Sequence, residues 1–243
     1  MNENELQLDL NRTGIGIVPA RSKELIASVS SAKPSSEGNE ELISDVRNTY
    51  TEPGSTIGHI PAPVSEDAVE TVIAEPAEGQ ATAVLVDKLG ERLAFERTGV
   101  RLYDALIAKF DAAGKLDGDL TRAELVAIRD EEHQHFRQVK SAIEKLGGDP
   151  TVVTPSADLA GVKAMGLPQV LTDPRTTLVQ ALEAILVAEL VDNEGWSTLI
   201  ELAEKLGHSS LAIKFRKALA SEEEHLAKVR GWVKEMTLSA SAA

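Results

Sequence analysis

Four long stretches of this sequence repeat apolar side chains at the three- and four-residue spacing of an α-helix. Each stretch interrupts its apolar stripe with a glutamate, and two of them add a histidine three residues later. These polar residues are Glu96, Glu132, His135, Glu189, Glu222 and His225. Because a helix buries its apolar stripe, all six side chains are expected to point into a shared core. The chain can therefore fold only if that core accommodates charge.

Turn and capping residues divide the chain after residue 80 into four predicted helices. Thr121 and Glu124 match a capping box, and Asp173-Pro174 matches an N-cap followed by proline at the first helical position. Glycines at 114, 147 and 207 end three of the helices. The predicted spans are about 84–113, 121–147, 174–207 and 209–236.

The lengths of the connections predict how these helices pair. The outer connections are short, which favours two antiparallel hairpins, whereas the middle one spans residues 148–173 and contains a candidate short helix at 156–165. A bundle with one long crossover requires such a middle connection. We predict an all-α, ferritin-like four-helix bundle over residues 81–243.

Residues 1–80 have a different composition. They hold six of the ten prolines, with Ser, Gly and Glu between them, and show no sustained periodicity. Such a segment buries too little apolar surface to order itself, so it is either a flexible arm or an arm that packs on something else. We favour an arm that orders only by packing on something, such as a neighbouring subunit contacted through Leu6, Leu8, Leu10 and residues 15–18. We also expect a homo-oligomer of at least two chains.

The two predicted hairpins repeat one another. A shift of 93 positions places the first of the interrupting glutamates, Glu96, on the third, Glu189. A shift of 90 positions places the histidine pair of the second helix on that of the fourth. Two equivalent hairpins would form a pseudo-two-fold bundle in which the six polar residues meet near the axis.

The charge of this predicted cluster indicates what it binds. Four carboxylates in a low-dielectric core each lose several kcal/mol of hydration and repel one another, which two divalent cations would offset. Each Glu-x-x-His pair can serve one metal while Glu96 and Glu189 bridge or cap. Oxygen-rich sites with one imidazole per metal suit iron or manganese, and zinc is compatible.

The order Glu, Glu-x-x-His, Glu, Glu-x-x-His resembles that of the diiron carboxylate ferritin-like superfamily over about residues 84–237. The internal symmetry is similar to the rubrerythrin branch, in which one more carboxylate follows the ligand of the third helix by one turn. Asp192 lies at that position but is shorter than the usual glutamate. The sequence has no cysteine, so the cysteine-ligated iron domain of full rubrerythrins is absent from it and the resemblance implies a separate electron donor.

This resemblance implies two iron ions that react with dioxygen or peroxide, as in an oxidoreductase of ferroxidase or peroxidase type using Fe(II) with O2 or H2O2. Both Fe/Fe and Mn/Fe pairs use these ligands. A second hypothesis is an iron-storage or assembly protein whose arm directs oligomerisation or encapsulation, since residues 14–17 loosely resemble peptides that dock cargo in encapsulin shells. A third is oxygenation of an organic substrate, which an apolar cavity near Gly99 and Val100 would favour.

The remaining features have simpler interpretations. Tyr103 and Trp196 lie two turns from the paired glutamates and are predicted core aromatics, with a hydrogen bond to a ligand or an electron relay as the alternative. His133 lies off the apolar stripe and is predicted to be exposed. The net charge of −14 argues against nucleic-acid binding. Without a signal peptide or a membrane-length apolar run, the protein is expected in the cytoplasm.

Overall fold

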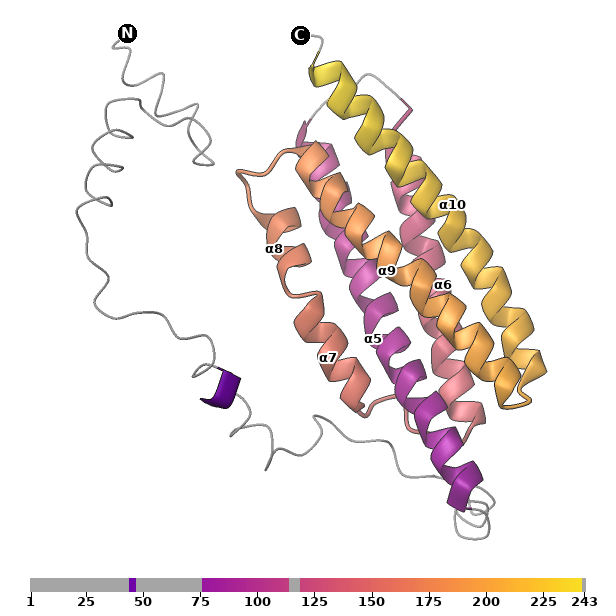
Figure 1. Ribbon diagram of the computed structural model, residues 1–243. Coiled ribbons are helices and arrows are strands. Elements are labelled where there is room, and N and C mark those ends of the chain that lie inside the picture. Colours follow the sequence, from indigo (N-terminus) through magenta and orange to yellow (C-terminus); the bar gives the residue numbers. More distant parts are fainter. Residues whose placement is uncertain (1–43, 47–75, 114–118, 242–243) are drawn as a thin grey trace, which may run out of the picture. The chain divides into compact units, whose positions relative to one another are not determined.

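The computed structural model describes residues 44–46, 76–113 and 119–241 (Figure 1). The chain divides into two compact units, Met1–Ser55 and Thr56–Ala243. In the first unit, residues 44–46 form a short exposed helical segment. The predicted arm at 1–80 otherwise lies outside the described residues, except that its last five residues already belong to a helix.

The second unit is all-α over its described residues, as predicted. Its helices are α5 (Pro76–Ala113), α6 (Arg122–Lys145), α7 (Pro155–Lys163), α8 (Gly166–Thr172), α9 (Leu178–Lys205) and α10 (Ser209–Ala240). Helix α5 packs on α6 and α9, and α9 packs on α10, so the four long helices form the predicted bundle (Figure 1). The crossover from α6 to α9 carries α7 and α8, which lie against α5 and α9.

Several boundaries differ from the prediction. The crossover holds two short helices instead of one, because Pro168 lacks the amide hydrogen that a continuous helix would need there. Asp173 does not cap α9. Its carboxylate instead accepts the backbone N–H of Arg175 at 2.9 Å, and Thr177 forms a reciprocal capping box with Gln180.

The predicted helix ends at Gly147 and Gly207 are confirmed, whereas Gly114 lies outside the described residues. Gly147 and Gly207 have φ values of 76° and 77°, a left-handed conformation that terminates a helix and that other residues adopt with strain. These turns close α6 and α9 and so fix the lengths of the helices that carry the central polar residues.

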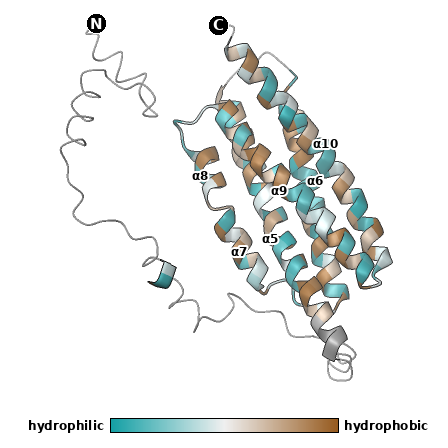
Figure 2. Ribbon diagram, in the orientation of Figure 1, coloured by the Kyte–Doolittle hydropathy of each residue, from teal (hydrophilic) through white to brown (hydrophobic). Residues whose placement is uncertain are grey.

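The apolar core consists of two clusters with a polar layer between them. One cluster contains Leu106 and Ile128, and the other contains Leu89 and Val139. On α6, for example, Glu132 lies between Ile128 of the first cluster and Val139 of the second. Figure 2 shows apolar and polar residues alternating around each long helix. The four long helices therefore each place one carboxylate at the same depth.

No helix in the described part of the chain has both the length and the apolar character needed to cross a lipid bilayer.

Candidate metal centre

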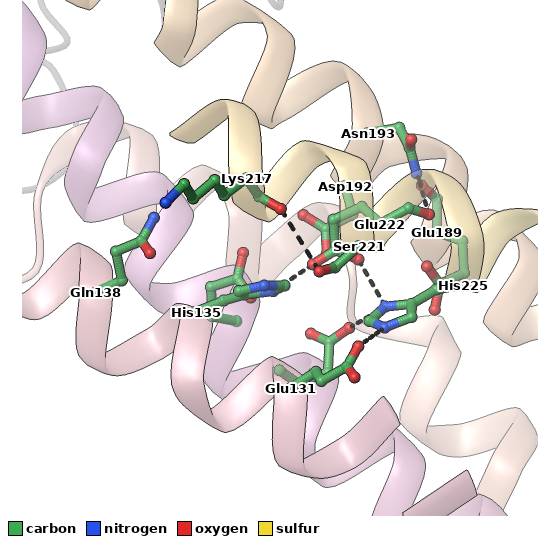
Figure 3. Close-up of polar contacts among 12 residues, drawn as sticks. Glu131, His135, Gln138, Glu189, Asp192, Asn193, Lys217, Ser221, Glu222 and His225 are labelled. Atoms are coloured by element: carbon green, nitrogen blue, oxygen red, sulfur yellow. Dashed lines mark hydrogen bonds and ion pairs between the residues drawn. The ribbon is translucent and has the colours of Figure 1, made fainter. Parts of the chain in front are cut away.

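The structure brings all six predicted polar residues together in the middle of the bundle. The most exposed of them, His135, has only 6 % of its surface accessible, and Glu96 and Glu222 have none. The long helices hold these side chains at matching depths, and Figure 3 shows several of them converging from α6, α9 and α10. His133, in contrast, is exposed, as predicted.

The ligand atoms fall into three overlapping groups in which all atoms lie within 4.8 Å of one another. The groups are Glu132, Glu189, Glu222 and His225; Glu96, His135 and Glu222; and Glu96, Glu132, Asp192 and Glu222. Glu222 belongs to all three, and Glu96 and Glu132 belong to two each. Glu96 and Glu189 never share a group, so of their two predicted roles the geometry favours capping opposite ends over bridging.

Glu222 lies between the two imidazoles. Its Oε1 is 2.5 Å from His135 Nδ1, and its Oε2 is 3.0 Å from His225 Nδ1. Burial would raise the pKa of Glu222, but the contacts with His135 and His225 lower it to about 2. Burial would likewise lower the pKa of His225, but Glu132 and Glu222 raise it to about 11. Glu222 is therefore the carboxylate that keeps its negative charge.

The other glutamates are electrostatically frustrated. Burial, reinforced by neighbouring carboxylates, raises the pKa of Glu96 and of Glu132 well above the ordinary value. Burial and the charge of Glu222 raise the pKa of Glu189 to about 8. Without added positive charge, these groups hold protons near neutral pH.

Five carboxylate oxygens of this cluster are buried without a hydrogen-bond partner among the described residues, and Glu222 Oε1 is one of them. The others are both carboxylate oxygens of Glu96, Oε2 of Glu132 and Oε2 of Glu189. An unsatisfied buried polar group of this kind costs about 1–3 kcal/mol or more. The donor set, carboxylate oxygens with one imidazole for each position, suits iron or manganese. The residues therefore fit a pair of divalent ions.

The family model described as "Ferritin-like domain" matches residues 86–239, which is more than half of the chain. The chain belongs to this family. No curated protein matches it. A crystal structure of ferritin-like, diiron-carboxylate proteins from Bacillus anthracis str. Ames is similar at 18 % sequence identity, over 63 % of this chain and 97 % of that one. The TM-score of that match is 0.49.

The ferritin-like core contains a cation that the sequence did not reveal. Arg92 is only 3 % exposed, and its Nη1 donates to the Asp192 carboxylate and, at 2.9 Å, to the Asp192 backbone oxygen. Its Nε lies 3.4 Å from Glu96 Oε1, and its guanidinium carbon lies 4.4 Å from the centre of the Phe95 ring. A Cβ on Gly195 would lie 2.7 Å from Nη1, so the glycine makes room for this cation.

Asp192, the predicted additional carboxylate, is buried in the cluster but paired with Arg92. Burial raises its pKa to about 7, although Arg92 opposes that shift. The five buried carboxylates carry −5 when ionised, and Arg92 reduces this to −4, the charge that two divalent ions neutralise. Arg92 therefore offsets the negative charge of Asp192, the fifth carboxylate beside the four predicted glutamates.

Tyr103 and Trp196 are fully buried core aromatics, as predicted, and both also touch the cluster. The Tyr103 hydroxyl donates to Glu189 Oε1, which is the alternative role considered for it. Burial and the charge of Glu189 raise the pKa of Tyr103 well above its ordinary value, so it stays a hydrogen-bond donor. Trp196 packs edge-on against His135 with ring centres 5.6 Å apart. Asn193 Nδ2 donates to the backbone oxygens of Glu189 and Glu222 at 2.9 and 3.0 Å, which ties α9 to α10.

The space beside Gly99 is occupied by a site residue and not by an apolar cavity. A Cβ at residue 99 would overlap Oε2 of Glu132 and would lie 3.0 Å from its Cδ. A hollow of about 630 Å³ lies elsewhere, between α5, α7, α8 and α9, and is lined by residues such as Arg92, Phe95 and Val191. Among the described residues that line it, none belongs to the six predicted ligands.

The close approach of Gly99 to Glu132 predicts a specific defect in Gly99→Ala. The added methyl group displaces the Glu132 carboxylate, so binding of divalent metal weakens and the free energy of unfolding falls by about 1–3 kcal/mol. Gly161→Ala, in α7, is the matched control because its Cβ would meet nothing within 4 Å. Urea unfolding and metal titration measure both effects, and a Gly99→Ala protein that matches the control would contradict this account.

The raised pKa values predict that the metal-free protein loses stability as the pH rises. The pKa of Glu189 is about 8 when folded against an ordinary 4.5, and that of Asp192 is about 7 against 3.8. Between the ordinary pKa of each group and its raised pKa in the folded chain, the folded chain binds more protons than the unfolded chain. The stabilisation present at low pH is therefore lost as the pH rises through about 8. His225, with a pKa raised to about 11, acts in the same direction above its ordinary 6.5.

Urea unfolding of metal-free protein between about pH 5 and pH 8 measures this fall in the free energy of unfolding. Glu189→Gln, which keeps the shape but cannot ionise, should show a smaller fall. Stability that rises over this range, or the same fall in Glu189→Gln, would show that these groups are not frustrated.

Proposed function

We propose that this protein holds a dinuclear iron centre and acts as an oxidoreductase of the ferroxidase or peroxidase type, with Fe(II) and O2 or H2O2 as reactants. The observation that carries the proposal is the buried set of four glutamates and two histidines, whose unsatisfied oxygens converge within ligand distance. Such a set is unfavourable unless cations neutralise it.

The three ligand groups support two neighbouring positions for the ions. Glu189 and His225 would hold one ion, Glu96 and His135 the other, and Glu132 and Glu222 reach both. The bound ferrous ions would supply Lewis acidity and electrons for reaction with dioxygen or peroxide. A manganese–iron pair fits the same donors.

The protein's own residues prepare this chemistry in three ways. The two apolar clusters on either side of the polar layer keep the ligands out of bulk water. Tyr103 and Asn193 hold the side chain and the backbone of Glu189, so that this ligand keeps its place on α9. Arg92 balances Asp192 and leaves a net charge that a pair of divalent ions cancels.

The position of the large hollow favours small reactants over an organic substrate. None of the six ligands is among the described residues lining it, and Arg92, which lines it, also contacts Glu96 and Asp192 of the cluster. An organic molecule bound there would not touch the ligands, whereas Fe(II), O2 and H2O2 are small enough to reach a closed core. Each molecule of peroxide reduced consumes two electrons, so repeated turnover needs an electron donor, and we propose that a separate molecule supplies them.

Iron content after anaerobic ferrous loading tests the proposal. We expect about two irons per chain in the wild type, as in related dinuclear sites, and a sharp loss in the double variant Glu132→Ala, His135→Ala. The matched control is Asp130→Ala, His133→Ala, which removes a pair of the same spacing on the exposed side of α6. Equal iron content in all three proteins would contradict the proposal.

Mixing the loaded protein with O2 or H2O2 then separates the possible functions. Rapid repeated turnover supports an oxidoreductase, and the faster oxidant distinguishes a ferroxidase from a peroxidase. Slow uptake without turnover would instead identify an iron-storage protein.

A further inference from the structure

The two imidazoles of the cluster have different surroundings on their outer side. His225 directs Nδ1 at the cluster, 3.0 Å from Glu222 Oε2 and 3.6 Å from Glu132 Oε1. Its Nε2 lies 2.7 Å from Oε2 of Glu131, a side chain that is 45 % exposed (Figure 3). The His225 side chain is only 1 % exposed, so this contact joins a buried ring to the edge of the bundle.

A carboxylate at the outer nitrogen determines which form of the ring faces the cluster. An ionised carboxylate only accepts hydrogen bonds, so it requires the hydrogen of a neutral imidazole to be on Nε2. In the neutral ring that a metal would require, the lone pair of Nδ1 then points at the cluster. A carboxylate in this position also fixes the ring orientation and makes the ligating nitrogen a stronger base.

The internal repeat provides a natural comparison for this contact. The 90-residue shift that places Glu132 on Glu222 also places Glu131 on Ser221. Ser221 donates weakly, at 3.5 Å, to the backbone oxygen of Lys217 in its own helix. The ion pairs of His135 are all made through Nδ1, and in the described part of the chain no carboxylate pairs with its Nε2.

Helix α6 therefore supports His225 in two ways from adjacent positions. Glu132 shares a ligand group with His225, and Glu131 binds the opposite edge of the same ring. The corresponding turn of α10 supplies Glu222 to His135 but carries a serine, Ser221, at the position equivalent to Glu131. The ligands are thus equivalent in the two hairpins, whereas only His225 has a carboxylate at its outer nitrogen among the described residues.

We propose that Glu131 is a positioning residue for His225 and makes the two metal positions unequal. This inference rests on the proposed function, since it assumes that the cluster binds metal. The position built from Glu189 and His225 binds a divalent ion more tightly than the position built from Glu96 and His135. The tighter position fills first, so substoichiometric metal, or the first of two different metals, occupies the end of the cluster that Glu131 supports.

Titration of the metal-free, full-length protein with Mn2+ tests this proposal, because EPR of the solution reports free Mn2+ directly. We expect two binding steps in the wild type, with the first about 10-fold or more tighter than the second. Glu131→Ala should weaken the first step by about 10–100-fold and leave the second in place, which is the usual range for loss of such a partner. Glu131→Gln keeps an acceptor without the charge and should give a smaller loss.

Ser221→Ala is the matched control and should leave both steps unchanged. Ser221→Glu restores a carboxylate at the position that the repeat makes equivalent to Glu131, and it should tighten the second step. Thermal unfolding of each metal-free variant separates these effects from loss of the fold, because Glu131 lies at the edge of the bundle and its removal should leave the midpoint nearly unchanged.

Two equal steps in the wild type, an equal weakening of both steps by Glu131→Ala, or the same loss in Ser221→Ala would overturn the inference while leaving a two-metal site intact. A wild-type protein that binds no Mn2+ and no Fe2+ would instead overturn the proposed function, and this inference with it.

Discussion

Five carboxylates lie buried at one level of this bundle, and a single buried arginine is the only permanent cation among the described residues that contact them. Removing a charge from water is unfavourable by several kcal/mol even after the protein relaxes. The metal-free chain lowers this penalty by retaining protons on Glu96, Glu132 and Glu189. Two divalent ions would remove the need for those protons. The fold therefore buries an excess of negative charge that bound divalent cations would neutralise.

The rest of the bundle is arranged around that layer. Its apolar residues form two clusters, one on each side, so hydrophobic burial holds the helices together while the middle remains polar. Gly99 leaves room for the Glu132 carboxylate, and Gly195 leaves room for Arg92. Asn193 joins α9 to α10 at the same depth. Glycines and polar residues thus lie in the polar layer, where side chains or backbones approach closely, and apolar residues fill the clusters on either side of it.

Much of this arrangement was predictable because the spacing of residues along a helix determines which face of the helix each side chain lies on. An acid on an otherwise apolar stripe has to point inward, which identified Glu96 and Glu189 without any knowledge of the fold. The repeated hairpin then placed His135 opposite His225. The family match confirms the fold that these patterns predicted.

Other features depend on tertiary contacts that spacing does not encode. Arg92 precedes Glu96 by one turn and could equally have extended into water, because long cationic side chains often do so. Its burial becomes clear only when α9 brings Asp192 and Gly195 beside it. The contact of Glu131 on α6 with His225 on α10 likewise joins residues that are 94 positions apart in the sequence. The predicted arm at 1–80 lies almost wholly outside the described residues, and its proposed role in assembly stays a prediction.

The most direct test of the central claim is anomalous diffraction at the iron absorption edge from crystals loaded anaerobically with Fe2+. The account predicts two adjacent peaks inside the bundle, one near Glu189 and His225 and the other near Glu96 and His135, with Glu222 between them. Peaks confined to surface acids, or a core without any peak, would contradict the claim that these buried carboxylates form a dinuclear metal centre.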